Sequence, residues 1–229
     1  MRTRRTAAWI AWTLAGLGSL LTRAAPAQEP GGEPPPAPQQ PEKAEGRMQS
    51  KVMLRGYCHG DSEEWEGLGG HARSENRPRA LPAAERERHQ AVALVLRLET
   101  RTTFRGTRGF ELGLVNGTQE KQGFSASDSR LPIVQEAQDR EGKWRPIEYL
   151  PSSWCGNSYH TVFLQPGQQW VFAVPRYEGP FATKLRFRLD RGQGQPPLYS
   201  AEFEGSIHES QFTAKEGHQA ENLMDPYED

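Results

Sequence analysis

The stretch TKLRFRLD, residues 183–190, alternates between apolar and charged side chains. Three large apolar residues share one set of alternate positions and four charged residues share the other: Leu185, Phe187 and Leu189 against Lys184, Arg186, Arg188 and Asp190. A period of two is that of a β-strand, in which successive side chains point to opposite faces. The stretch therefore predicts a strand with one face in a core and the other in water.

Segments with similar patterns lie on both sides of this strand. They occupy residues 48–55, 91–100, 110–115, 133–138, 144–149, 160–164, 169–174 and 199–207. Turn-forming sequences separate them, such as Asn116-Gly117 and Pro166-Gly167, and only residues 82–90 have a weak helical pattern. About nine short strands of this kind predict an all-β fold, an antiparallel β-sandwich with Trp170 and Phe172 in its core.

The strand spacing over residues 48–212 resembles, at the level of fold only, the immunoglobulin-like and fibronectin-type domains of exported proteins. The chain lacks the paired cysteine and tryptophan spacing of antibody domains. The resemblance therefore implies an immunoglobulin-like sandwich and transfers no functional residue.

The first 27 residues have the three parts of a secretory signal peptide. Arg2, Arg4 and Arg5 supply positive charge, residues 7–21 form an apolar run, and Ala25-Pro26-Ala27 offers small residues for cleavage after Ala27. The run of about 15 residues is shorter than the roughly 20 that span a bilayer, so no membrane insertion is expected after cleavage. The sequence predicts an exported protein, periplasmic or extracellular.

The rest of the chain divides by composition. Residues 28–47 are rich in proline and predict a disordered linker, residues 48–213 form the sandwich domain, and residues 214–229 are a polar tail expected to be disordered. A loop as long as the polar segment 60–90 is either functional or disordered, and disorder is the expectation here. Removing four arginines with residues 1–27 leaves 24 basic and 29 acidic side chains, a net charge of about −5. This balance argues against nucleic acid as a partner.

The chain has two cysteines, Cys58 and Cys155. An even number of cysteines in an exported protein favours a disulfide, and we predict that these two are bonded to each other. In this interpretation both cysteines have a structural role.

Cys155 and His160 also allow two chemical alternatives. With Gln165 and an upstream imidazole from His59, His71 or His89, they have the local spacing of a cupredoxin-like copper loop. The same cysteine and histidine could form a thiol nucleophile and its base. An unidentified secreted hydrolase stays open as well, although the carboxylates of Glu148, Asp190, Glu202 and Glu204 are expected on outward faces, paired with basic residues.

Aromatic residues give the best indication of binding. Trp154 and Tyr159 flank Cys155 in a loop rich in glycine, asparagine and serine, and Tyr177 follows a predicted strand. Exposed tryptophan and tyrosine faces suit sugar rings or a protein partner. The sequence thus predicts an exported, non-enzymatic binding or structural protein without a cofactor, with a protein or carbohydrate partner and a surface at residues 151–160 and Tyr177.

Overall fold

The computed structural model describes residues 46–152, 156–192 and 194–217. The predicted signal peptide, almost all of the linker and the end of the tail lie outside the described residues. The described residues all belong to one unit, residues 41–229. None of their helices is long and apolar enough to cross a membrane.

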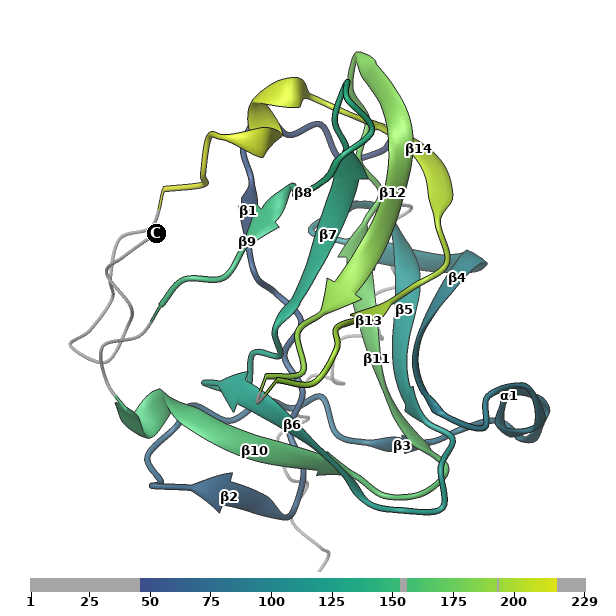
Figure 1. The fold of residues 1–229 in the computed structure, drawn as a ribbon, viewed down its shortest axis with the longest axis vertical. Coiled ribbons are helices and arrows are strands. Elements are labelled where there is room, and N and C mark those ends of the chain that lie inside the picture. Colours follow the sequence, from purple (N-terminus) through teal and green to yellow (C-terminus); the bar gives the residue numbers. More distant parts are fainter. Residues whose placement is uncertain (1–45, 153–155, 193, 218–229) are drawn as a thin grey trace, which may run out of the picture. The chain divides into compact units, whose positions relative to one another are not determined.

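The fold is mostly β, with antiparallel sheets and a single α-helix in the described part (Figure 1). One sheet has the order β3-β11-β5-β4: Arg79–Ala80, Gln168–Pro175, Thr107–Asn116 and Val92–Phe104. A second has the order β13-β12-β7-β8, with β14 also paired to β12: Leu198–Tyr199, Phe181–Leu189, Ile133–Gln138, Trp144–Pro146 and Phe203–Ile207. A third has the order β2-β10-β6: Trp65–Gly67, Tyr159–Leu164 and Gln122–Ser127.

Five smaller elements complete the described part of the fold. They are the parallel pair β1 and β9 (Leu54–Arg55 and Glu148–Tyr149), the helix α1 (Ala83–Arg88), and the 3-10 helices η1 (Gly156–Ser158) and η2 (Glu209–Phe212). The helix α1 is fixed to the four-stranded sheet by Arg97, which pairs with Glu85 of the helix and donates to Gln169 Oε1 at 2.8 Å. The helix lies within residues 82–90, the stretch with a weak helical pattern.

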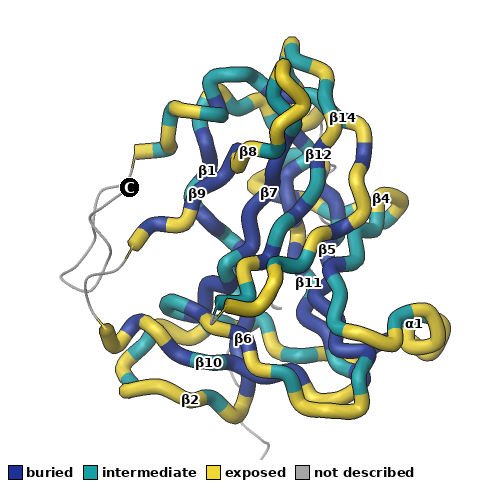
Figure 2. The backbone as a smooth tube through the Cα atoms, viewed as in Figure 1, coloured by how far each residue is buried: buried dark blue, intermediate teal, exposed yellow. Residues whose placement is uncertain are grey.

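One hydrophobic core joins the sheets, and its residues follow the predicted alternation. Leu185, Phe187 and Leu189 of β12 are all buried, as is Trp170 of β11. The ring of Phe110 on β5 meets that of Phe203 on β14 at a centroid distance of 5.4 Å. Figure 2 shows the buried positions running along β5, β7 and β11. Burying each large apolar side chain contributes about 1.5–3 kcal/mol, which makes this core the main source of stability.

The charged face of β12 is paired across the sheet, as expected. Glu136 on β7 lies 2.8 Å from Arg186 and 2.9 Å from Arg188, and Lys184 lies 3.3 Å from Glu202. The half-exposed pair of Lys184 and Glu202 contributes little to stability, whereas the two pairs of the buried Glu136 join β12 to β7 and help to fix their register.

The strand prediction was right for the long strands and incomplete for the short ones. The described residues contain fourteen strands, because two predicted segments each divide into two and because β2, β3 and β6 were missed. Only Leu54–Arg55 of the first predicted segment is a strand, and its pairing with β9 is parallel.

Two segments expected to be disordered have defined structure. Residues 60–90 contain β2, β3 and α1. The tail begins against the domain, since Met53 N–H donates to the Ala214 carbonyl at 2.7 Å and Glu216 N–H donates to the Met53 carbonyl at 2.8 Å. Main-chain pairing supplies order here that composition does not indicate.

The Asn116-Gly117 turn is structural, as predicted. Asn116 is fully buried and its Nδ2 donates to the carbonyls of Glu120 at 2.8 Å and Leu164 at 3.0 Å. A Cβ on Gly117 would overlap the main-chain carbonyl of His89, so only glycine fits.

Candidate functional site

The residues predicted to form a binding surface do not come together as one exposed patch. Trp154 and Cys155 lie outside the described residues. Tyr159 begins β10 with 48% of its surface exposed, whereas Tyr177 is buried, with 2% exposed. Tyr177 therefore presents no surface to a ligand, and that part of the predicted site is wrong.

Tyr177 instead belongs to a buried polar cluster around Glu148. Glu148 Oε1 accepts hydrogen bonds from the hydroxyls of Tyr57 at 2.6 Å and Tyr177 at 2.9 Å, and Oε2 accepts one from the Gln135 main-chain N–H at 2.9 Å. The expectation that Glu148 faces outward is thus wrong, because only 1% of it is exposed. Burial raises the pKa of Glu148 to about 7, against the effect of the three hydrogen bonds.

Cys58 departs from the predicted disulfide. It is a buried free thiol in the hydrophobic core, with 1% of its surface exposed. Its expected partner, Cys155, lies outside the described residues. Burial raises the pKa of the Cys58 thiol well above its usual value, and the nearby charge of Glu148 adds to the shift. In this environment the side chain packs as a small apolar group.

His160 stacks on His71, one of the three histidines expected as its partner. The ring centroids are 3.6 Å apart with an interplanar angle of 15°, and Trp65 meets His71 edge-on at 4.7 Å. His160 Nδ1 lies 3.0 Å from the Ser158 carbonyl oxygen. Among the residues that the structure describes, His160 Nε2 and both ring nitrogens of His71 are buried and find no hydrogen-bond partner. Burial lowers the pKa of His71, with further contributions from His160 and Arg73.

A tight turn holds the loop that carries His71. Asp128 and Ser129 have φ values of 49° and 60°, the left-handed region that non-glycine residues seldom adopt. The Asp128 carboxylate accepts from the Ala72 N–H at 2.9 Å, and Ser129 Oγ donates to the Ala72 carbonyl at 2.8 Å. His59 Nδ1 lies 3.3 Å from the Asp128 carbonyl oxygen, so three histidines gather around this turn.

These histidines do not form a metal site within the described residues. No group of three or more histidine, cysteine, aspartate or glutamate side chains there is suited to holding a metal ion. Of the upstream histidines proposed for a copper loop, the structure brings His71 to His160. The cysteine that such a loop requires lies outside the described residues.

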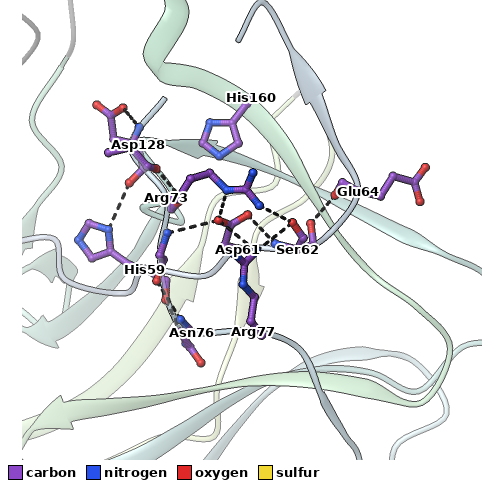
Figure 3. A network of polar contacts seen from close by, with 12 residues as sticks. His59, Asp61, Ser62, Glu64, Arg73, Asn76, Arg77, Asp128 and His160 are labelled. Atoms are coloured by element: carbon purple, nitrogen blue, oxygen red, sulfur yellow. Dashed lines mark hydrogen bonds and ion pairs between the residues drawn. The ribbon is translucent and has the colours of Figure 1, made fainter. Parts of the chain in front are cut away.

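A second polar network, centred on Asp61, adjoins the histidines (Figure 3). The Asp61 side chain is fully buried and accepts from the main-chain N–H groups of Ser62 at 2.7 Å and Ser74 at 3.3 Å. It also pairs with the guanidinium groups of Arg73 and of Arg77, the latter at 3.2 Å. Burial opposes the charge of Asp61, but the hydrogen bonds from Arg73 and Ser62 outweigh it and lower the pKa.

The network also fixes the segment to the sheets. Trp170 Nε1 donates to the Asp61 carbonyl at 2.9 Å, and Asn76 Nδ2 donates to the carbonyls of His59 at 3.0 Å and Val171 at 3.1 Å. Ser62 Oγ accepts from the Phe163 N–H on β10 at 2.9 Å. These bonds explain why a polar segment with few apolar residues is ordered: its main-chain groups are satisfied by the sheets.

A groove of about 640 Å³ lies beside this network. Its wall residues are Ser62, Glu63, Glu64, Arg73, Arg77, Pro78, Phe163, Gln165 and Gln168. Arg73 and Arg77 each keep more than two-fifths of the side chain exposed, at 42% and 43%, although Asp61 is fully buried. Glu64 pairs with Lys121 at 2.6 Å, which offsets one of the two negative charges of the groove.

This site was not predicted from the sequence, because its arginines and acidic residues lie in the segment expected to be disordered. Only Arg73, Arg77 and the acidic run 61–64 were visible there as a set of charges. The Gly69-Gly70 pair, with φ values of 92° and 79°, was a usable signal, since consecutive left-handed residues indicate a defined turn before His71. Comparison of the chain with protein-family models, curated proteins and solved structures finds no match.

Proposed function

We propose that this chain is an exported, non-enzymatic binding protein built on an immunoglobulin-like β-sandwich. The architecture is supported by the core that the two larger antiparallel sheets share. Export is supported by the charged, apolar and small-residue regions of residues 1–27. The ligand site is the groove at Arg73 and Arg77 in place of the surface around Tyr177.

The observation that carries this proposal is the locking of two half-exposed guanidinium groups by one buried carboxylate. Asp61 fixes one nitrogen of each arginine, and Arg73 and Arg77 also donate to the Ser62 carbonyl at 3.0 Å and 3.2 Å. Because these contacts already hold the two arginine side chains, the side chains would lose little conformational entropy when a ligand binds. Guanidinium groups recognise carboxylates with paired hydrogen bonds.

The remainder of the groove suits a sugar. Gln165 and Gln168 offer amide groups to hydroxyls. Phe163 is buried beneath Lys121, so it contributes only the small apolar edge that reaches the groove wall. A carboxylate-bearing carbohydrate, such as an oligomer of uronic acids, combines both requirements.

The test is calorimetric titration of the secreted protein with tetragalacturonic acid and with its methyl ester. The acid should bind and the ester should bind about tenfold or more weakly, because the ester removes the charge that the arginines recognise. Arg77→Gln should lose the preference for the acid. Arg79→Gln is the matched control, since Arg79 is exposed on β3 and does not line the groove. Equal binding of acid and ester, or equal effects of the two substitutions, would reject the proposal.

A second candidate, the cupredoxin-like redox or metal protein, is favoured by one observation. His71 lies against His160 with its ring nitrogens unpartnered within the described part of the chain. Titration with Cu²⁺ should then quench Trp65, whose ring contacts His71, and His71→Phe should abolish the quenching. Quenching that is the same in this variant would reject the metal site.

A further inference from the structure

Three arginines from separate parts of the chain meet at one end of the four-stranded sheet. The main chain brings them together: Arg108 N–H donates to the Gly46 carbonyl at 3.0 Å, and Met48 N–H donates to the Arg176 carbonyl at 2.9 Å. Arg47 is therefore held between a residue bonded to Arg108 and a residue bonded to Arg176. We call Arg47, Arg108 and Arg176 the arginine cluster.

Sheet register places two of the three directly beside each other. The pairing of β11 with β5 ends at Pro175 opposite Gly109, so the next residues along the two segments are Arg176 and Arg108. The guanidinium of Arg176 lies over the buried ring of Phe110, 5.1 Å from its centroid. This cation–π contact orients Arg176, which stays partly exposed at the edge of the core.

The positive charge of the cluster is not offset by ion pairs. Within residues 46–152, 156–192 and 194–217, none of the three arginines has a carboxylate within salt-bridge distance. Desolvation lowers the pKa of Arg176, and repulsion from Arg47 and Arg108 lowers it further, against the attraction of Glu99. Holding like charges together costs free energy, which a bound anion would offset.

We propose that the arginine cluster binds the sulfate or phosphate ester groups of an acidic polysaccharide. Guanidinium groups carried by three segments whose main chains are bonded side by side suit a tetrahedral oxyanion, which accepts several hydrogen bonds at once. The small size of the cluster and the net charge of about −5 after residues 1–27 favour recognition of discrete ester groups over a broad anionic surface such as nucleic acid or a membrane. This inference does not rest on the groove, which uses none of these residues.

The test measures binding of the secreted protein to immobilised dextran sulfate and to unsubstituted dextran. Arg47→Gln, Arg108→Gln and Arg176→Gln are combined in one variant. The matched control combines Arg79→Gln, Arg88→Gln and Arg191→Gln, which change the net charge equally outside the cluster. The cluster variant should bind dextran sulfate about tenfold or more weakly, while the control should change by less than about twofold. Circular dichroism and thermal unfolding establish that both variants fold, and each single substitution is measured in case the triple variant does not.

The other possible outcomes either overturn the proposal or identify the ester group. Absence of binding to dextran sulfate, or equal losses in the two triple variants, would overturn the proposal, since the second result reports net charge alone. Stronger cluster-dependent binding to phosphatidylglycerol vesicles than to dextran sulfate would overturn the assignment to a polysaccharide. Competition by inorganic phosphate at lower concentration than by inorganic sulfate would support the site and identify phosphate esters as its ligand; the reverse order would identify sulfate esters.

Discussion

The imidazole ring of His71 lies flat on that of His160, with centroids 3.6 Å apart. His71 lies in the loop after β2, His160 lies on the neighbouring strand β10, and their contact closes that loop over β10. Ring nitrogens without partners make this contact sensitive to protonation, because a charged imidazole requires solvent or an acceptor.

Acid should destabilise the protein partly through His71. The pKa of His71 is lowered in the fold from 6.5, chiefly by burial, so the folded state binds fewer protons than the unfolded chain just below that pH. Its contribution to stability is therefore complete above pH 6.5 and lost as the pH falls through the folded pKa. His71→Phe keeps a ring on His160 and should reduce the loss in unfolding free energy between pH 7.5 and 5, measured with urea. An unchanged pH dependence in the variant would contradict this.

Glu148 should act in the opposite direction. Its pKa is raised from 4.5 to about 7, so the folded state binds more protons between these values and stability falls as the pH rises through this window. Glu148→Gln removes the titration. From pH 4.5 to 8 the unfolding free energy of the variant should rise relative to wild type by on the order of 3 kcal/mol. Tyr177→Phe removes a hydrogen bond that lowers the pKa of Glu148, so the unfolding free energy should fall more steeply with pH in this variant than in wild type. A shallower fall would show that the Glu148 cluster is not the source of the pH dependence.

The same Glu148 shows why sequence alone predicted only part of this fold. Alternation over residues 144–149 assigned it to an outward face, but the strand divides at Ile147, and Ile147, Glu148 and Tyr149 are all buried. A break of one residue resets the alternation, and nothing local indicates it. By contrast, the alternation predicted for β12 was confirmed, because this long strand has no break and its side chains keep one register along its length.

The candidate site was beyond prediction for a related reason. Asp61 is ordered by contacts with Arg73 and Arg77 nearby, and by Trp170, 109 residues further on. Such long-range hydrogen bonds leave no periodic signal. The residues that were predicted to bind were chosen by type, and burial of Tyr177 could not be inferred from type alone.

Asp61→Asn should loosen the groove and weaken uronate binding. The neutral amide loses the charge that holds Arg73 and Arg77, and a buried group with fewer partners costs about 1–3 kcal/mol. Hydrogen exchange of residues 62–78 should speed up more than exchange in β12. Asp190→Asn is the matched control, because Asp190 is exposed and accepts one N–H, from Gly192 at 2.9 Å. Equal effects of the two substitutions would show that the network does not order this segment.

Gly117→Ala should destabilise the Asn116-Gly117 turn strongly. The added Cβ would overlap the main-chain carbonyl group of His89. The two main-chain segments cannot move apart without breaking the hydrogen bond from the Gly117 N–H to the Ala91 carbonyl. A cost of about 2–4 kcal/mol is expected in urea unfolding. Gly156→Ala is the control, because a Cβ there meets nothing within 4 Å. If Gly117→Ala costs no more than Gly156→Ala, the close approach of the two main chains is wrong.

Cys58 should resist alkylation in the folded protein. The thiolate is the reactive form, and burial together with the Glu148 charge raises the pKa of Cys58, so little thiolate exists at pH 8 and reagents cannot reach it. Mass spectrometry after iodoacetamide should show Cys58 unmodified in buffer and modified in denaturant without reductant. Modification that requires reductant as well would establish the predicted bond to Cys155 and overturn the free thiol.

The stability of Cys58→Ala tests the same point. If Cys58 is a free thiol packed in the core, the substitution should cost only the loss of a small apolar group, about 1 kcal/mol, whereas loss of a disulfide would cost roughly 2–5 kcal/mol.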